Sequence, residues 1–412
     1  MKKILYISAF VCSTLMANEE LQSIKEQLKI QQQTTKRLEQ KLDMMQEAQN
    51  QKSINNSASF SQNGYLPEIA LILNMSALSR DVKNSDYEDL SIPGFIDSGD
   101  AKLPFNKNRG LNLNYAEVAM HSVVDPYFEA FANFHLHPDA FEIGEAYVQT
   151  TSLPYSLRIK AGKFKSNFGR INSKHQHSWR FDDQPIIFKS LFGPDGISDP
   201  AIQLQWVAPT DIYLMFGTEA MQGTNERSFG AKDSNNLYTG YLKTSIDITD
   251  DLCILGGMSY AHGSNEQNGK INPTDIYGID FTLTQQFGSY SSLLWQSEFI
   301  RRDKKGEDDT SKQSGLYSEV VYQYNNNYSL GARYDRILKN DTDLEYYKNN
   351  NISTSNLDKY TAMIEYKPFP MSRLRLSYSY DTTKVINNKR KEINQIMLSL
   401  NIAAGAHGAH DY

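Results

Sequence analysis

From Pro67 onward, apolar and polar side chains alternate with a period of two, and this alternation constrains the fold more than any other feature. In residues 373–380, with sequence RLRLSYSY, leucine and tyrosine occupy one face of an extended chain and arginine and serine occupy the other. Residues 277–286 and 392–402 repeat the pattern. Such two-faced strands belong either to a half-buried soluble sheet or to a membrane-spanning β-sheet. A mean hydropathy of −0.55 with no apolar run of 18 residues excludes a protein with membrane-spanning helices.

The links between strands decide between these two sheets. Sixteen candidate strands lie near residues 67–77, 111–123, 126–136, 140–152, 154–164, 200–208, 211–219, 237–248, 251–262, 274–286, 289–301, 315–325, 327–337, 358–368, 372–382 and 392–402. Short links, such as Val124-Asp125 and Pro209-Thr210, alternate with long polar links, such as 165–199 and 263–273; the short link 137–139 is the exception. This asymmetry is typical of outer-membrane barrels, which have tight periplasmic turns and longer external loops. We therefore expect an all-β fold, a transmembrane antiparallel β-barrel of about 16 strands over residues 67–412.

The residues before the barrel predict export and a short helix. Residues 1–17 have the basic start, apolar run and small-residue exit of a signal peptide, which indicates the outer membrane of a Gram-negative bacterium. Apolar residues recur every three and four positions in 18–50, which predicts a coiled-coil helix, although a single amphipathic helix lying on another surface fits as well. Residues 51–66 are rich in serine, asparagine and glutamine and form a predicted linker.

Composition and motifs exclude other classes. The formal net charge of −6 argues against a protein that binds nucleic acid through general positive charge. The chain contains no P-loop, Gly-x-Ser-x-Gly or His-Glu-x-x-His motif, so we expect no enzymatic activity. The 25 tyrosines suit the aromatic girdles of a membrane barrel. A channel and a non-conducting structural or adhesive barrel both remain open.

If the apolar face of each strand contacts lipid, charged side chains line the interior. The acidic residues come from early strands and most of the basic ones from late strands, so the pore would have an acidic half and a basic half. The predicted pore-lining residues of the strands are Glu117, Glu129, Glu145, Arg158, Lys160, Arg333, Lys367, Arg373 and Arg375. Such a lumen is water-filled, because unpaired charges in a dry core are prohibitive. The alternative is that these charges neutralise one another in internal salt bridges, with Glu365 pairing one of the arginines.

The long link 165–199 is a candidate constriction. It is basic and aromatic, and it is long enough to fold inward and place Lys174, Arg180 and Lys189 in the permeation path. These cations would bias the pore toward anionic solutes, and deleting residues 172–190 should raise the conductance. The alternative is an external loop that packs against its neighbours.

Histidine gives the one indication of a metal site. His135-x-His137 and His175-x-His177 each place two imidazoles on the same side of an extended chain, and the two pairs could converge. Imidazole suits zinc, copper or nickel. The sequence therefore leaves a zinc site possible in a protein that otherwise needs no cofactor.

Several motifs resemble a known family. Residues 115–210 are similar to porin-like outer-membrane proteins related to the phosphate-selective porins, some of which carry the label zinc-regulated TonB-dependent outer-membrane receptor. The similarity lies in the segments 124–127 (VDPY), 145–148 (EAYV), 161–165 (AGKFK), 168–172 (FGRIN), 175–177 (HQH) and 183–185 (DQP), and the C-terminal residues 405–412 fit the same group. The resemblance implies a diffusion channel for small hydrophilic solutes, and the cations of the 165–199 link extend this to anionic solutes. A gated receptor would need a plug domain and a 22-stranded barrel.

The remaining expectations concern partners. By resemblance and from the 18–50 seam we expect a homotrimer in outer-membrane lipid. Tyr412 would supply the terminal aromatic residue that the barrel-assembly machinery reads during insertion. A metal-uptake or metal-binding role is the alternative function.

Overall fold

The computed structural model describes residues 67–88, 90–96, 108–137, 140–230, 237–306, 310–341, 347, 349–386 and 389–405. The chain divides into two units, Met1–Leu66 and Pro67–Tyr412, and the description concerns the second. The predicted signal peptide, coiled-coil helix and linker lie outside the described residues, as does Tyr412. Within those ranges, every helix is too short or too polar to cross a membrane.

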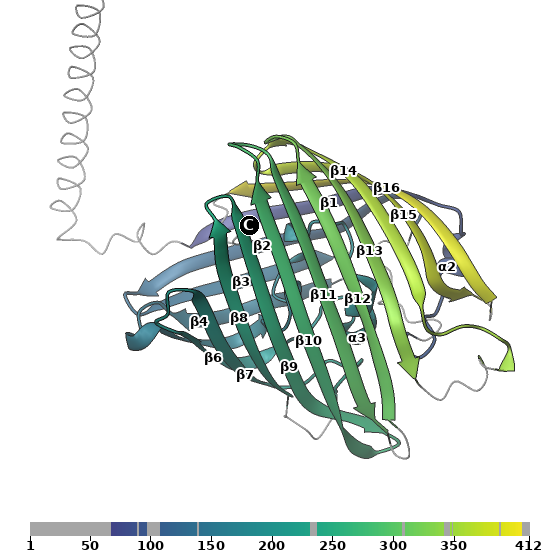
Figure 1. Ribbon diagram of the computed structural model, residues 1–412, viewed down its shortest axis with the longest axis horizontal. Coiled ribbons are helices and arrows are strands. Elements are labelled where there is room, and N and C mark those ends of the chain that lie inside the picture. Colours follow the sequence, from purple (N-terminus) through teal and green to yellow (C-terminus); the bar gives the residue numbers. More distant parts are fainter. Residues whose placement is uncertain are drawn as a thin grey trace, which may run out of the picture. The chain divides into compact units, whose positions relative to one another are not determined.

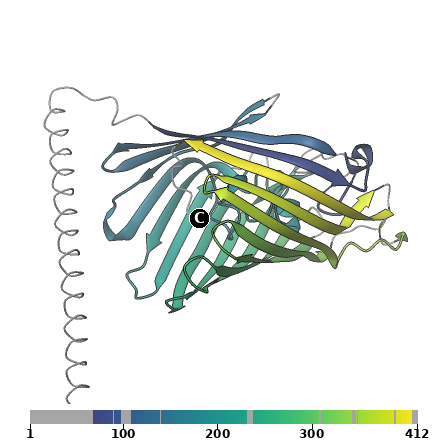
Figure 2. The same cartoon turned by 90° about the horizontal axis from the view of Figure 1, so that it is seen from above.

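Sixteen antiparallel strands in the described ranges form a closed barrel, which confirms the predicted fold (Figure 1). Each strand pairs with its neighbours in the sequence, and β1 pairs with β16 to close the ring; Figure 2 shows the yellow last strand beside the purple first strand. The strands are β1 (Glu68–Arg80), β2 (Gly110–Asp125), β3 (Phe128–His137), β4 (Ala140–Thr150), β5 (Leu157–Lys165), β6 (Ser198–Val207), β7 (Tyr213–Met221), β8 (Leu237–Thr249), β9 (Leu252–Gln267), β10 (Lys270–Gln286), β11 (Ser292–Lys305), β12 (Thr310–Gln323), β13 (Tyr328–Asp341), β14 (Leu357–Phe369), β15 (Ser372–Ile386) and β16 (Lys389–Gly405). The short helical elements are α2 (Asn84–Glu88), η2 (Pro154–Ser156), η3 (Gln176–Ser178) and α3 (Ile186–Phe192).

The strands extend further than predicted at the end of the barrel that carries the longer links. The predicted link 263–273 is mostly strand, because β9 and β10 continue to a two-residue turn at Asn268-Gly269. Both turn residues have positive φ, 51° and 76°, which matches the right-handed twist of a β-hairpin. Several predicted external loops are therefore tips of paired strands.

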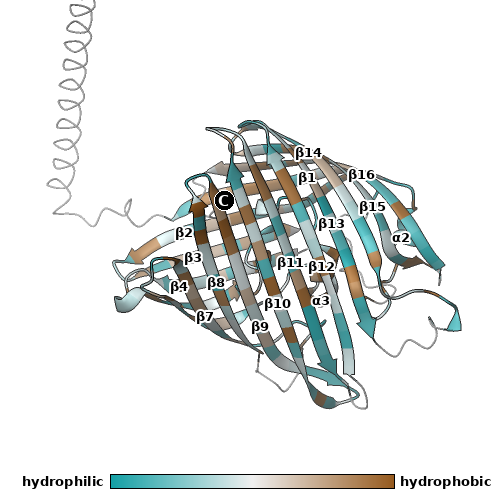
Figure 3. Ribbon diagram, viewed as in Figure 1, coloured by the Kyte–Doolittle hydropathy of each residue, from teal (hydrophilic) through white to brown (hydrophobic). Residues whose placement is uncertain are grey.

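Hydrophobic and hydrophilic residues alternate along the strands of the barrel wall (Figure 3), and their exposure shows that the two faces of the wall differ in polarity. On β15, Leu374, Leu376 and Tyr378 are exposed on the outer face, whereas Arg375 and Ser377 are buried on the inner face. Exposed aromatic residues also gather at the short-turn end: Tyr127, Tyr155, Phe287, Tyr290, Tyr324 and Phe369. An apolar outer band with an aromatic girdle is the arrangement of a barrel surrounded by lipid.

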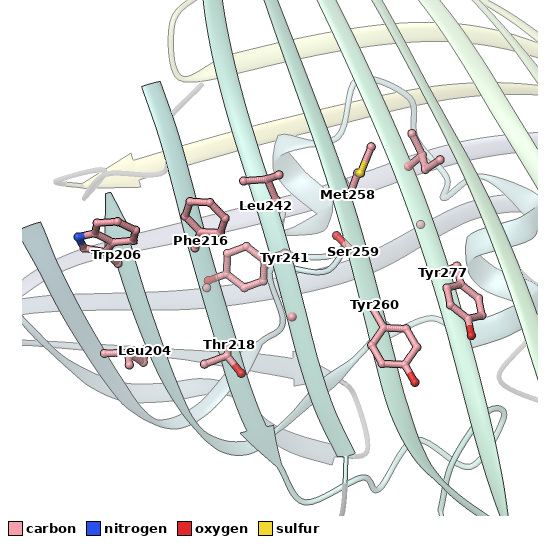
Figure 4. A pocket seen from close by; sticks show the side chains of 14 residues that line it. Leu204, Trp206, Phe216, Thr218, Tyr241, Leu242, Met258, Ser259, Tyr260 and Tyr277 are labelled. Carbon is pink, nitrogen blue, oxygen red and sulfur yellow. The ribbon is translucent and has the colours of Figure 1, made fainter. Parts of the chain in front are cut away.

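The outer face also carries an apolar depression of about 690 Å³ over β6–β10 (Figure 4). It lies where the paired residues Thr218 and Gly240 leave space between larger neighbours such as Trp206 and Tyr260. The depression belongs to the face that contacts lipid, so it is separate from the interior.

The link between β5 and β6, residues 166–197, folds into the barrel and forms an apolar core there. The helix α3 contacts β11, β12 and β13 from within the ring (Figure 1). Two wall glycines permit this contact, because a Cβ at Gly278 would lie 2.9 Å from Phe168 and one at Gly315 would lie 2.9 Å from Ile187. The buried members of this core from the link are Phe168, Ile171, Trp179, Ile186, Ile187, Phe188, Leu191, Phe192 and Ile197. We call residues 166–197 the inward loop.

Candidate functional site

One side of the inward loop is fixed to the wall by ion pairs whose cations are buried in the wall. Asp183 accepts a hydrogen bond from Arg333 at 2.7 Å and also pairs with Lys359. Asp182 accepts a hydrogen bond from Arg375 at 2.9 Å. Burial alone would raise the pKa of Asp183, but Arg333 and Lys359 outweigh it and hold that pKa below its usual range. Loop acids and wall bases thus neutralise each other along β13–β15.

The arginines that the sequence analysis placed on a basic wall of the pore also lie on this side of the inward loop. Arg375 is 1% exposed and also donates to Glu365 at 2.6 Å, so the pairing alternative describes it. Arg373 donates to the backbone carbonyls of His177 and Trp179. The expectation of an open basic half of the pore is wrong for Arg333 and Arg375, because carboxylates of the loop and of the wall itself pair with them.

The other side of the loop has the opposite arrangement. Arg170 contacts Asp280 of β10 at 2.6 Å, and Arg180 lies 3.0 Å from Gln296 and 3.7 Å from Glu319. The side chains of Arg170 and Arg180 are 17% and 24% exposed, whereas those of Asp280 and Glu319 are 1% and 3% exposed. Here the cations reach solvent and the carboxylates lie beneath them.

Lys174 belongs to this solvent-facing group, and Lys189 does not. Burial, together with the nearby Arg180 and Arg170, lowers the pKa of Lys174 to about 8 against the opposing effect of the Glu319 carboxylate. Lys189 lies on α3, where burial lowers its pKa to about 7. It lines a small cavity of about 60 Å³ with Asp183, Lys359, Asp381 and Lys384, so the predicted grouping of Lys189 with Lys174 and Arg180 is wrong.

Four other predicted lumen residues lie toward the short-turn end. Lys160 sits 4.5 Å above the Tyr147 ring, and Arg158 is exposed at the start of β5. Glu129 lies 3.1 Å from His121, and Lys367 lies 3.2 Å from Glu365. Glu365 also pairs with Arg375, so Lys367 joins the ion pairs on the fixed side of the inward loop, whereas Lys160 and Glu129 contact side chains of neighbouring strands.

The predicted histidines converge on an acidic residue. Glu117 of β2 lies opposite His135 of β3 in the strand register, with 3.7 Å between Oε2 and Nε2. The inward loop adds His175, whose Nδ1 is 3.9 Å from Glu117 Oε1, and His177, whose Nδ1 is 3.3 Å from Glu117 Oε2. We call these four residues the histidine cluster. The side chain of His137 lies outside the described residues.

A second carboxylate supports the histidine cluster from β4. Glu145 Oε2 lies 2.5 Å from His175 Nε2. Burial would lower the pKa of His175, but the Glu145 and Glu117 carboxylates outweigh it and raise that pKa. Glu117, Glu145, His175 and His177 are each less than a tenth exposed, whereas the side chain of His135 is 24% exposed.

The exposed edge of the histidine cluster faces a large polar cavity. This cavity holds about 960 Å³ at the barrel end with the longer links, and its lining includes His135. The charged lining residues are Glu142, Lys163, Lys165, Asp195, Glu226, Arg227, Arg302 and Lys304. Solutes outside the barrel therefore reach both the inward loop and the edge of the histidine cluster.

A sequence relative establishes the family. An uncharacterized protein of Aquifex aeolicus is 36% identical over 385 residues, which cover 86% of this chain and 81% of that protein. The chain belongs to this protein's family. No family model matches the sequence.

Solved structures establish the porin-like outer-membrane channel fold. The outer-membrane channel DcaP of Acinetobacter baumannii has a TM-score of 0.55 at 10% identity, covering 84% of this chain and 99% of that chain. The anion-selective porin of Comamonas acidovorans has a TM-score of 0.53 at 9% identity, covering 82% and 99%. The trimer form of OmpT from Vibrio cholerae has a TM-score of 0.50 at 11% identity, covering 82% and 99%. At these identities the likeness concerns the fold.

The sequence analysis did not identify three residues of this protein's candidate site as functional. Asp182 and Asp183 hold the inward loop against the wall, and their signal was a pair of acids in an otherwise basic link. Arg170 follows Gly169, whose positive φ of 63° turns the chain into the barrel interior after Phe168. Its signal was its position in the FGRIN segment, at the start of the inward loop.

Proposed function

We propose that this protein is an outer-membrane channel for the passive diffusion of small hydrophilic anions, with Arg170, Lys174 and Arg180 setting the preference. The observation that carries the proposal is the exposure of these cations above buried carboxylates. A permeating ion comes closest to the exposed cations, and because the Coulomb energy falls with distance, these cations act on it more than the carboxylates behind them do. The anion-selective porin of Comamonas acidovorans, with the same kind of fold, also supports an anionic solute.

The test is a planar-bilayer recording of the full-length protein in asymmetric KCl. We expect stepwise conductance and a reversal potential on the anion side. The double variant Lys174→Met/Arg180→Gln should move the reversal potential toward zero. The matched control is Arg301→Gln, because Arg301 is an arginine on the outer face whose side chain is 48% exposed and paired with Asp303.

Each alternative has its own outcome in this recording. Absence of conductance steps from correctly folded protein would favour a non-conducting structural or adhesive barrel. A cation-side reversal potential would overturn the anion preference while leaving the channel in place.

We also propose that three copies assemble in the membrane. The OmpT structure described as a trimer form supports this assembly, as does the predicted seam in residues 18–50. Native mass measurement of the full-length protein in detergent tests it, and a monomer would contradict it. Deleting residues 18–50 should loosen the assembly without unfolding the barrel.

A further inference from the structure

We propose that Glu117, His135 and His175 form a binding site for one divalent transition-metal cation of the zinc type, with His177 beside it. The proposal concerns binding, so it stands or falls separately from ion conductance. Its evidence is the donor set, the spacing of the donor atoms, a buried carboxylate oxygen that accepts no hydrogen bond, and a route of access.

The donor set suits this class of cation. Two imidazoles and one carboxylate are the ligands of many catalytic zinc sites, and imidazole also suits copper and nickel. Calcium and magnesium prefer all-oxygen sites, so they are poor candidates. The three residues come from three elements, β2, β3 and the inward loop, and strand pairing fixes the first two opposite each other.

The spacing of the donors is close to that of a bound metal. One donor atom from each residue lies within 4.8 Å of the others. Bonds of about 2.0–2.1 Å in a tetrahedral site place ligand atoms about 3.4 Å apart. The separations are 3.7 Å from Glu117 Oε2 to His135 Nε2 and 3.9 Å from Glu117 Oε1 to His175 Nδ1, and each is within about half an ångström of that spacing.

Two features of the surroundings favour a metal over a plain ion pair. Oε1 of Glu117 is buried and accepts no hydrogen bond from the described residues, which is unfavourable for a carboxylate unless a cation supplies the missing partner. Glu145 accepts a hydrogen bond from Nε2–H of His175, which directs Nδ1 toward Glu117. A carboxylate that orients a metal-binding histidine in this way is a recurrent feature of zinc sites. The Asn133 amide, 3.2 Å from the same Nδ1, would give way to the metal.

The site is open to solvent on one side and spans two parts of the protein. His135 lines the 960 Å³ cavity at the long-link end, so a cation can arrive from that side. Because Glu117 and His135 belong to the wall and His175 to the inward loop, a bound metal would cross-link the loop to the wall. Metal occupancy would then hold the segment whose His177 carbonyl already accepts a hydrogen bond from Arg373.

The experiment is zinc titration calorimetry of the full-length, folded, chelator-treated protein in detergent. We expect one zinc ion per chain in the wild type and at least about tenfold weaker binding in Glu117→Gln and in His135→Gln. His262→Ala is the matched control, since His262 is an exposed histidine that pairs with Asp275 on the outside of β9, and it should bind as the wild type does. The variant His407→Ala/His410→Ala tests the C-terminal histidines separately.

The result that overturns the proposal is equally defined. A wild type that takes up no zinc, or binding that survives Glu117→Gln and His135→Gln but is lost in His407→Ala/His410→Ala, rejects this site. If the variants do not fold, the proposal can still be tested on the wild type alone by chemical modification of its histidines. Zinc should protect His135, but not His262, from modification by diethyl pyrocarbonate, and equal modification of both with and without zinc also rejects it.

Discussion

Both sides of the inward loop form pairs between basic and acidic side chains, but the arrangement of these pairs differs between the two sides. Toward β13–β15, Asp182 and Asp183 pair with arginine and lysine side chains that are buried in the wall, while Asp183 itself is 25% exposed. Toward β10–β12, Arg170 and Arg180 are partly exposed, and the carboxylates beneath them are buried. Charge on a barrel wall therefore does not by itself indicate a pore surface: on the first side the buried partners are the wall cations, and on the second side they are the wall carboxylates.

The largest expected effect comes from breaking the fixed side. Arg375→Met leaves Asp182 and Glu365 buried without their shared partner, and removing one member of a buried pair destabilises a protein by about 3–5 kcal/mol. We expect the urea midpoint of unfolding, followed by tryptophan fluorescence in detergent, to fall sharply. Arg301→Gln should change the free energy of unfolding by less than about 0.5 kcal/mol. Equal stability of Arg375→Met and wild type would show that the loop is held by its apolar core alone.

A smaller stability effect is expected at Lys189, with a defined pH dependence. Its pKa is about 7 in the folded protein and near 10.4 in an unfolded chain. Below pH 7 both states carry the charge, and burial disfavours the folded one; between pH 7 and about 10 the folded state is neutral and this disadvantage shrinks. Lys189→Met should therefore unfold about 1–2 kcal/mol less readily than wild type at pH 6. The difference should narrow by pH 9, and a constant difference across this range would contradict the assignment.

On the solvent-facing side, the expected effect is on selectivity. Lys174 is protonated below its pKa of about 8 and neutral above it, so the anion preference should fall as the pH rises from 6 to 9. One charge about 10 Å from a permeating ion in water contributes about 0.4 kcal/mol, or about a twofold change in permeability ratio. Reversal potentials at the two pH values measure it. Lys174→Met should lack this pH dependence, and a variant that retains it would assign the titration to another group.

The smallest expected effect concerns salt. The difference in selectivity between wild type and Lys174→Met/Arg180→Gln should shrink as KCl approaches 1 M, where the screening length is about 3 Å. The stability loss in Arg375→Met should change little over the same range, because buried pairs are screened much less than exposed ones. Similar salt dependence in both experiments would mean that the two sides of the loop do not differ in exposure.

The strands of the barrel could be predicted from the sequence, whereas the contacts in the barrel interior could be predicted only in part. Alternation with a period of two is a local signal, and it located all sixteen strands to within a few residues. Strand length at the long-link end was underestimated, because the Asn268-Gly269 turn signal lies inside a polar stretch that resembles a loop. Polar residues at the tip of a strand differ from those in a loop in being hydrogen-bonded to a neighbouring strand, and the sequence alone does not show this.

The histidine cluster illustrates the limit more sharply. A turn at Val124-Asp125 would pair Glu117 with Ala132, whereas the turn at Pro126-Tyr127, with a register shift at Val123, pairs Glu117 with His135. A shift of a few residues in one hairpin thus hides the carboxylate that joins the histidines. The apolar run at 186–192 was a further unused signal, since a loop that carries six buried residues in seven must pack against something.

The apolar core inside the barrel has a consequence for assembly. Its members include Val82 and Ile92, which follow the first strand, and Ile386 and Ile393 from the last two strands. Ser91 also pairs with Val385 across the same region. This core is complete only when the first and last strands of the barrel have met. Its packing therefore stabilises the closed ring in addition to the hydrogen bonds between β1 and β16. A ring that closed one strand short would leave part of this core uncovered, so the packing of the interior favours the complete ring of sixteen strands.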